Sequence, residues 1–152
     1  MKRLIGLLIC SLLTLALAAG SSTSEEPSAS YESAQALVDA QDFEAAVTEL
    51  KNLVANDPDN PDSHNLLAYS LRNLGEFETA LSHYESALEL DPTHVGALEY
   101  LGELYLKLGD VEMAQAQLET LATVETCAGE CEEYGMLAEA IEAYTTTGEV
   151  GW

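Results

Sequence analysis

The chain has few basic residues: Lys and Arg together number 5 against 27 Asp and Glu, which gives a formal net charge of −22. Lys2 and Arg3 stand at the amino terminus, so the chain without them has a charge of −24 and retains only Lys51, Arg72 and Lys107 as basic residues. Such a chain repels nucleic-acid phosphates and anionic lipid head groups, so both are excluded as favourable partners. The acidity fits a basic partner, bound cations or a salty medium, and it equally fits a surface that is acidic only for solubility.

The sequence also lacks the motifs of the common enzyme classes. It has no Gly-x-Ser-x-Gly, no phosphate-binding loop and no dinucleotide fingerprint. His64, His83 and His94 form no His-x-x-x-His pair, so we predict surface or groove-edge positions for them and no metal site. The acidic stretch 57–62 lacks the central glycine and terminal glutamate of a calcium loop. We therefore predict no catalytic residues and no cofactor.

Long hydrophobic runs are absent except at residues 4–17, which form one apolar run of 14 residues. A membrane-spanning helix needs about 20. The run follows two basic residues and ends at Ala16-Leu17-Ala18, which places small residues where a signal peptidase reads them. We therefore predict a signal peptide over residues 1–18, cleaved after Ala18 with Gly20 as second choice, and a periplasmic or secreted protein.

Two alternatives for this segment stay open. The first is an uncleaved anchor. The second is a lipoprotein modified at Cys10, although Ile9 stands where a lipoprotein signal has a small residue. Residues 19–30 are rich in Ser, Thr and Glu and have no apolar periodicity, so we expect a flexible spacer. No membrane association is expected after cleavage, and the signal fits a Gram-negative bacterium.

Cysteine is scarce, and removal of the signal peptide leaves only Cys127 and Cys131. An even number of cysteines in an oxidising compartment predicts one intrachain disulfide. A thiol-redox pair and a metal-handling pair remain as alternatives. The spacing is not Cys-x-x-Cys, and no basic residue lies nearby in sequence to lower a thiol pKa, which argues against the redox alternative.

The sequence does contain a 34-residue repeat that runs three times without insertion or deletion. Positions at this step include Ala46, Ala80 and Ala114; Glu44, Glu78 and Glu112; and Phe43, Phe77 and Val111. Pro58 and Pro92 keep the same step, and Thr126 takes the next place. A fixed period of this length predicts a solenoid in which each unit buries one face against the next.

Each unit is predicted to form two antiparallel helices. In the middle unit, apolar residues recur at helical spacing on both sides of Gly75, which can adopt a left-handed conformation at little cost. Pro92 ends the second helix because proline disfavours helix in the residue before it. The first unit is weaker, with Gln41 where the others have Gly75 and Gly109, as expected of a terminal repeat.

The middle unit resembles a tetratricopeptide repeat in Leu67, Ala68, Leu71, Gly75, Ala80, Tyr84, Ala87 and Pro92. The third unit matches in Leu101, Gly102, Tyr105, Gly109 and Ala114, then departs with Leu118, Leu121 and Thr126. The resemblance covers residues 27–126. It implies an all-α, right-handed α-α superhelix with repeats over residues 27–60, 61–94 and 95–128.

A seventh helix is predicted after the repeats. Tyr134, Leu137, Ile141 and Tyr144 fall on one helical face, so we expect a capping helix within residues 129–146 that covers the last core face. Residues 147–152 show no period and are expected to be frayed.

The resemblance implies a non-catalytic scaffold that binds a protein or peptide on the concave face of the first helices. By helical spacing and by analogy with the family, this face consists of Tyr31, Gln35, Asn65, Tyr69, Arg72, Asn73, Glu99, Glu103 and Lys107. A carboxylate-binding clamp found in some members is not reproduced, because Tyr31, Gln35 and Glu99 stand where basic or amide groups are needed. A constitutive accessory subunit is the alternative. Oligomeric state is left open.

Overall fold

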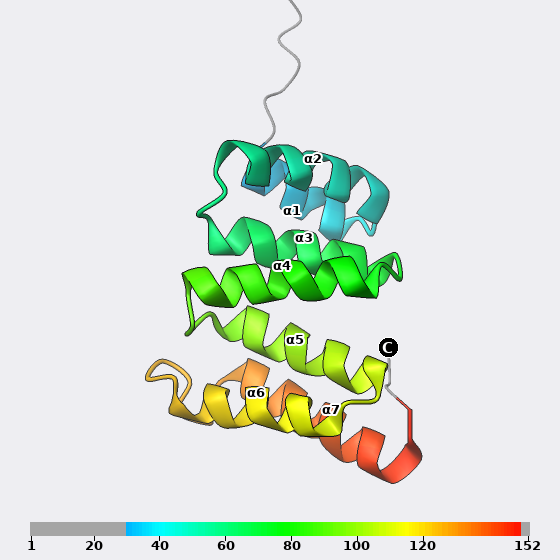
Figure 1. The fold of residues 1–152 in the computed structure, drawn as a ribbon, viewed down its shortest axis with the longest axis vertical. Coiled ribbons are helices and arrows are strands. Elements are labelled where there is room, and N and C mark those ends of the chain that lie inside the picture. The colour runs from blue at the N-terminus through cyan, green and yellow to red at the C-terminus, as the bar shows by residue number, and fades with distance from the viewer. Residues whose placement is uncertain (1–29, 150–152) are drawn as a thin grey trace, which may run out of the picture.

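The computed structural model describes residues 30–149, which form seven α-helices and no strand (Figure 1). The helices are α1 (Tyr31–Asp39), α2 (Phe43–Asn56), α3 (Pro61–Asn73), α4 (Phe77–Leu90), α5 (Val95–Leu108), α6 (Val111–Thr123) and α7 (Glu132–Thr147). The predicted all-α architecture of three helix pairs and a seventh helix is therefore confirmed. The predicted signal peptide, nearly all of the spacer and residues 150–152 lie outside the described residues. None of the described helices is long and apolar enough to cross a membrane.

The helices form two layers, with α2, α4 and α6 on one side and α1, α3, α5 and α7 on the other (Figure 1). Successive members of the second layer contact each other: α1 touches α3, α3 touches α5, and α5 touches α7. Within residues 30–149, no two of α2, α4 and α6 make such a contact. The stack therefore curves toward the layer of first helices, and that layer lines the concave face.

The helix ends follow from local sequence. Ser30, Asp42, Asn60 and Asp110 each accept a hydrogen bond from a backbone N–H in the first turn of the next helix. At the turn within a pair, Gly75 and Gly109 adopt φ of 80° and 85°. Gln41 adopts φ of 60° at the same position of the first pair, so the first unit keeps the turn despite lacking the glycine.

Buried apolar side chains form two cores. The first core contains residues from α1, α2, α3, α4 and α5, and the second contains residues from α5, α6 and α7. Ala46, Ala80 and Ala114 are fully buried at the start of the second helix of each pair. A small side chain at this position lets the two helices of a pair approach closely, which explains why alanine keeps the 34-residue step.

Replacing Ala80 with leucine is expected to lower the free energy of unfolding by about 1–3 kcal/mol, because the extra methylenes overpack the α3–α4 contact. Thr79→Leu, at the exposed neighbouring position of α4, is the matched control and should change stability little. Thermal unfolding followed by circular dichroism measures both. An unchanged melting temperature for Ala80→Leu contradicts the role assigned to this position.

The seventh helix differs slightly from the predicted segment. It begins at Glu132, because residues 127–131 form a turn, and it ends at Thr147, one residue later than predicted. In its last turn the hydroxyls of Thr146 and Thr147 donate to the carbonyls of Glu142 and Ala143, and Gly148 then adopts φ of 75°. Buried Leu137 and Ile141 face the second core, so α7 covers the end of the third repeat.

Candidate functional site: the concave groove

The concave face contains a cavity of about 380 Å³ near its amino-terminal end. Helices α1, α3 and α5 contribute most of its lining, with the turn before α2. The lining includes four predicted residues, Tyr31, Gln35, Asn65 and Tyr69. We refer to this hollow, which Val38, Asp39, Gln41, Phe43, Leu66 and Tyr100 complete, as the aromatic cavity.

Tyr69 lies at the centre of the aromatic cavity's ring cluster. Its ring centroid is 4.9 Å from that of Tyr100 and 6.2 Å from that of Phe43, which it meets edge to face. Such ring pairs are stabilising beyond the area they bury. The cluster therefore presents rigid, largely apolar rings beside hydroxyl and amide groups, a surface suited to one side chain of an extended partner.

Tyr100 was missed by the sequence prediction, although a signal for it exists. It stands 34 residues after Leu66, so the two share one repeat position, and both line the aromatic cavity. The first unit has Glu32 at this position, so the residue type does not repeat from unit to unit and gave no prediction. A tyrosine there extends past the core into the groove, and burial is the main reason its pKa is raised to about 12.

A second group of predicted residues, Arg72, Glu99 and Glu103, forms a charged cluster beneath the groove surface. Arg72 is only 6 % exposed, and its Nη1 lies 2.7 Å from Glu103 Oε2. The same nitrogen donates to the Tyr100 carbonyl at 3.3 Å. Its guanidinium carbon lies 5.2 Å and 5.3 Å from the ring centroids of Tyr69 and Tyr100. Arg72 therefore ties α3 to α5 and supports the rings of the aromatic cavity from below.

Glu99 does not lie on the groove surface, contrary to the sequence prediction. It is 2 % exposed, and its Oε2 has no hydrogen-bond partner among residues 30–149. Burial raises its pKa to about 8, and the negative charges of Glu103 and of Glu133 on α7 add to this, while Arg72 opposes it. The physical reason for the error is that α7 packs against α5 and places further acidic charge beside Glu99. At neutral pH this side chain is a neutral carboxylic acid.

Glu99→Gln is expected to reduce the change in the free energy of unfolding between pH 4.5 and about pH 8. The pKa of Glu99 is raised from 4.5 to about 8 in the folded chain, so between these values only the unfolded chain has lost the proton. Stability linked to Glu99 is therefore complete below pH 4.5 and falls until about pH 8. The variant and the wild type should match at low pH, and the variant should be the more stable above pH 8. Urea unfolding across this range measures the difference, and a constant difference contradicts the burial of a protonated Glu99.

The remaining predicted residues, Asn73 and Lys107, are exposed at the ends of α3 and α5. The Asn73 side chain donates to the Tyr69 carbonyl at 2.8 Å, so it also caps its own helix. Lys107 lines a separate hollow of about 460 Å³ between α5 and the end of α7. The structure thus brings four predicted residues into one cavity, buries or half-buries three below it, and leaves two apart.

Two tetratricopeptide repeat family models match the chain, one over residues 31–95 and the other over residues 71–125. Together they cover more than half of it. The chain belongs to the tetratricopeptide repeat family. No curated protein matches it in sequence.

Solved tetratricopeptide structures have the same fold. SycD, the type III secretion translocator chaperone of Yersinia enterocolitica, superposes with a TM-score of 0.64 at 18 % identity, covering 76 % of this chain and 90 % of that one. PcrH, in complex with the chaperone binding region of PopD, gives 0.66 at 19 % identity, covering 78 % and 90 %. The first repeat domain of RPAP3, bound to the HSP90 peptide SRMEEVD, gives 0.66 at 19 % identity, covering 76 % and 90 %. At such identities the likeness shows the tetratricopeptide fold.

The third tetratricopeptide repeat is followed by a turn that contains both described cysteines. Cys127 and Cys131 are joined by a disulfide in the structure, with Cα atoms 4.6 Å apart. Ala128 and Gly129 adopt φ of 49° and 74° within this turn. Cys127 is buried in the second core, so the turn fixes the position from which α7 begins. The cysteine pair lies in the core formed by α5, α6 and α7, whereas α1 and α3 contribute most of the aromatic cavity.

Proposed function

We propose that this protein is a non-catalytic scaffold that binds an extended peptide or protein segment in its concave groove. The observation that carries the proposal is the aromatic cavity, which combines tyrosine rings with amide groups in a preformed hollow. Asn65 is nine-tenths buried at this cavity, and its Oδ1 has no hydrogen-bond partner among residues 30–149. An amide oxygen in this position suits a peptide N–H. The peptide complexes of PcrH and RPAP3 support the proposal through their shared fold.

The partner segment is proposed to be basic. Asp39 lines the aromatic cavity, and Asp62 lies close enough to Tyr31 to raise its pKa, after the larger effect of burial. Glu133 on α7 adds negative charge near Glu99, whereas the charge of Glu103 is paired with Arg72. The HSP90 peptide bound by RPAP3, SRMEEVD, is acidic, and an acidic segment would be repelled here. A partner segment fits this groove when it places an aromatic or aliphatic side chain in the aromatic cavity and carries basic residues after it.

The protein is proposed to act outside the cytoplasm, in the periplasm or after secretion. The predicted signal peptide and the cysteine pair favour this location together, because an oxidising compartment preserves a disulfide. We propose that the pair is a structural staple. Titration of native secreted protein should find no reactive thiol, and two reactive thiols would overturn the staple in favour of the redox alternative.

The binding proposal is tested by cross-linked capture from native extracytoplasmic extract with residues 19–152 as bait. Tyr31→Ala combined with Gln35→Ala removes two groups from the rim of the cavity without touching the charged cluster. Leu90→Ala combined with Met113→Ala is the matched control, because these exposed residues lie on the second-helix layer. Circular dichroism checks that each variant is folded.

A partner captured by the wild type and the control but lost in the cavity variant supports the proposal. Retention by the cavity variant with loss in the control moves the contact to the convex face and favours the accessory-subunit alternative. Binding of the captured partner's basic segments, as synthetic peptides, should weaken steeply with salt. Preference for acidic segments contradicts the proposed charge of the partner.

A further inference from the structure

Two histidines meet in the middle repeat, away from the aromatic cavity. His64 on α3 and His83 on α4 bring their Nδ1 atoms to 3.1 Å, with ring centroids 5.2 Å apart. His64 is 7 % exposed, so the sequence prediction of a surface or groove-edge position is wrong for it, while His83 is half-buried. The burial follows from their places in the pair, because both rings lie between two helices in close contact.

The tautomer of His64 is fixed by its other nitrogen. Nε2 lies 3.0 Å from the carbonyl oxygen of Pro58, which can only accept, so Nε2 carries the hydrogen. In the neutral ring, Nδ1 then has a free lone pair directed at His83, and His83 Nδ1 donates to it. A histidine that binds a metal commonly donates its other N–H to a backbone carbonyl in this way, which orients the ring.

The spacing of the two nitrogens also fits a shared metal ion. Metal–nitrogen bonds of about 2.0–2.1 Å place two imidazole ligands about 3.3 Å apart on a tetrahedral ion and about 2.9 Å apart on adjacent corners of a tetragonal one. The observed Nδ1–Nδ1 distance of 3.1 Å is close to this spacing, and to bind one ion both rings turn their Nδ1 atoms away from the line that joins them. On binding, the His83 proton moves from Nδ1 to Nε2, so both Nδ1 lone pairs face the ion and no proton is lost from the pair.

We propose that His64 and His83 form a two-histidine site for a borderline divalent transition-metal ion, with Cu²⁺ preferred over Zn²⁺. Imidazole nitrogen favours these ions, and Cu²⁺ binds most tightly in the series. No third His, Cys, Asp or Glu converges on the pair within residues 30–149, so water completes the coordination. A hollow of about 400 Å³ lined by Pro58, His64, Ser86, Glu89 and Leu90 gives solvent access to the His64 side.

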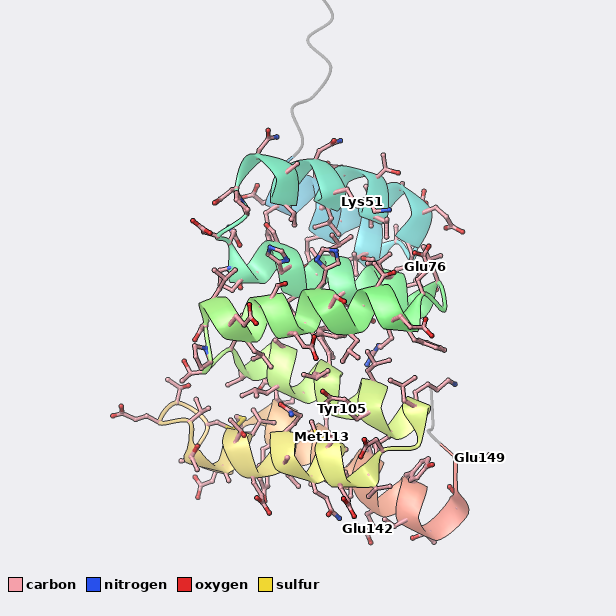
Figure 2. All side chains as sticks on the ribbon, viewed as in Figure 1. Lys51, Glu76, Tyr105, Met113, Glu142 and Glu149 are labelled. Atoms are coloured by element: carbon pink, nitrogen blue, oxygen red, sulfur yellow. A yellow bond between two sulfur atoms is a disulfide. The ribbon has the colours of Figure 1, made fainter. Side chains whose placement is uncertain are left out.

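A nearby positive charge, that of Lys51, is expected to lower the metal affinity of this site. Lys51, labelled on α2 in Figure 2, acts electrostatically on His83, whose pKa is lowered by burial, by His64 and by Lys51 in that order. A positive charge there also repels a metal cation. Because the two ligands come from different helices, a bound ion links α3 to α4 and stabilises the middle repeat.

The test is a Cu²⁺ titration of the chain after signal removal, without a histidine tag, read by electron paramagnetic resonance and by thermal unfolding. One equivalent of nitrogen-coordinated Cu²⁺ is expected, together with a rise in melting temperature. His83→Gln should weaken the affinity at least tenfold and abolish the rise. His64→Gln should do the same. If His64→Gln does not fold, because residue 64 is buried, His83→Gln alone tests the proposal. Lys51→Gln should tighten binding.

His94→Gln is the matched control. Both nitrogens of His94 are already used, since Nδ1 accepts from the Ala97 N–H at 3.1 Å and Nε2 contacts Asp62 at 3.0 Å. This variant should bind Cu²⁺ like the wild type, and Zn²⁺ but not Mg²⁺ should compete. Equal Cu²⁺ binding by wild type and His83→Gln would mean that the surface carboxylates hold the ion, which overturns the proposal. The absence of a nitrogen-coordinated signal overturns it as well.

Discussion

Replacing Arg72 with methionine is expected to lower the free energy of unfolding by about 3 kcal/mol, because it removes one partner of a largely buried ion pair. Arg72 is 6 % exposed and Glu103 is 15 % exposed. The substitution keeps much of the apolar stem but leaves Glu103 without its charged partner. Since Glu103 retains some access to water, the loss should fall at the lower end of the range for broken buried pairs.

Urea unfolding at neutral pH measures this loss. Glu103→Gln should also destabilise the protein, and the double variant should lose less than the sum of the two single losses, since the residues act on each other directly. Lys51→Met removes an equal charge from an exposed site on α2 and should change stability by less than about 0.5 kcal/mol. Additive losses at Arg72 and Glu103 would contradict the pairing.

The second large effect is expected at Gly102, where alanine should destabilise the protein by about 2–4 kcal/mol. A Cβ at Gly102 would stand 2.6 Å from both terminal methyl carbons of Leu137 and 3.2 Å from its Cγ. Leu137 is fully buried, so it cannot swing aside within the core. The added methyl therefore displaces the side chain by which α7 docks on α5.

Gly96→Ala provides the control on the same helix. Its Cβ would make only ordinary contacts, the nearest at 3.5 Å from Asn65 Nδ2, so the gain in helix propensity should stabilise the protein by about 0.5–1 kcal/mol. Leu137→Ala should destabilise the wild type but cost less in the Gly102→Ala background. Thermal unfolding of the four variants gives the comparison, and a Gly102→Ala protein as stable as the wild type would show that α7 is not held there.

The arrangement of helices could be predicted from the sequence, because the 34-residue step repeats features with a direct structural meaning. Buried Ala80, the turn at Gly75 and the apolar stripe containing Leu137 each follow from spacing alone. The first repeat shows the limit of this reasoning. Gln41 adopts the left-handed conformation because the neighbouring helices impose the turn, and residue preference alone does not indicate it.

The groove could be predicted only in part, because spacing gives the face of a helix but not the depth of a side chain. Tyr31 and Tyr69 line the aromatic cavity as expected, whereas Glu99 at an equivalent step is buried beneath α7. Tyr100 was missed because its repeat position holds Glu32 and Leu66 in the other two units, and these share no property that indicates a groove residue. The His64–His83 contact joins residues 19 positions apart, a separation that no helical periodicity relates.

The two layers differ in how they respond to force. Among residues 30–149, α1, α3, α5 and α7 contact one another in succession, while α2, α4 and α6 make no contact with one another. Successive helix pairs should therefore rotate relative to one another about the layer of first helices. Small rotations between successive helix pairs open or narrow the groove, while the outer helices move apart or together without losing contacts among themselves. We expect such rotations to let the groove adjust its width to partner segments of different bulk.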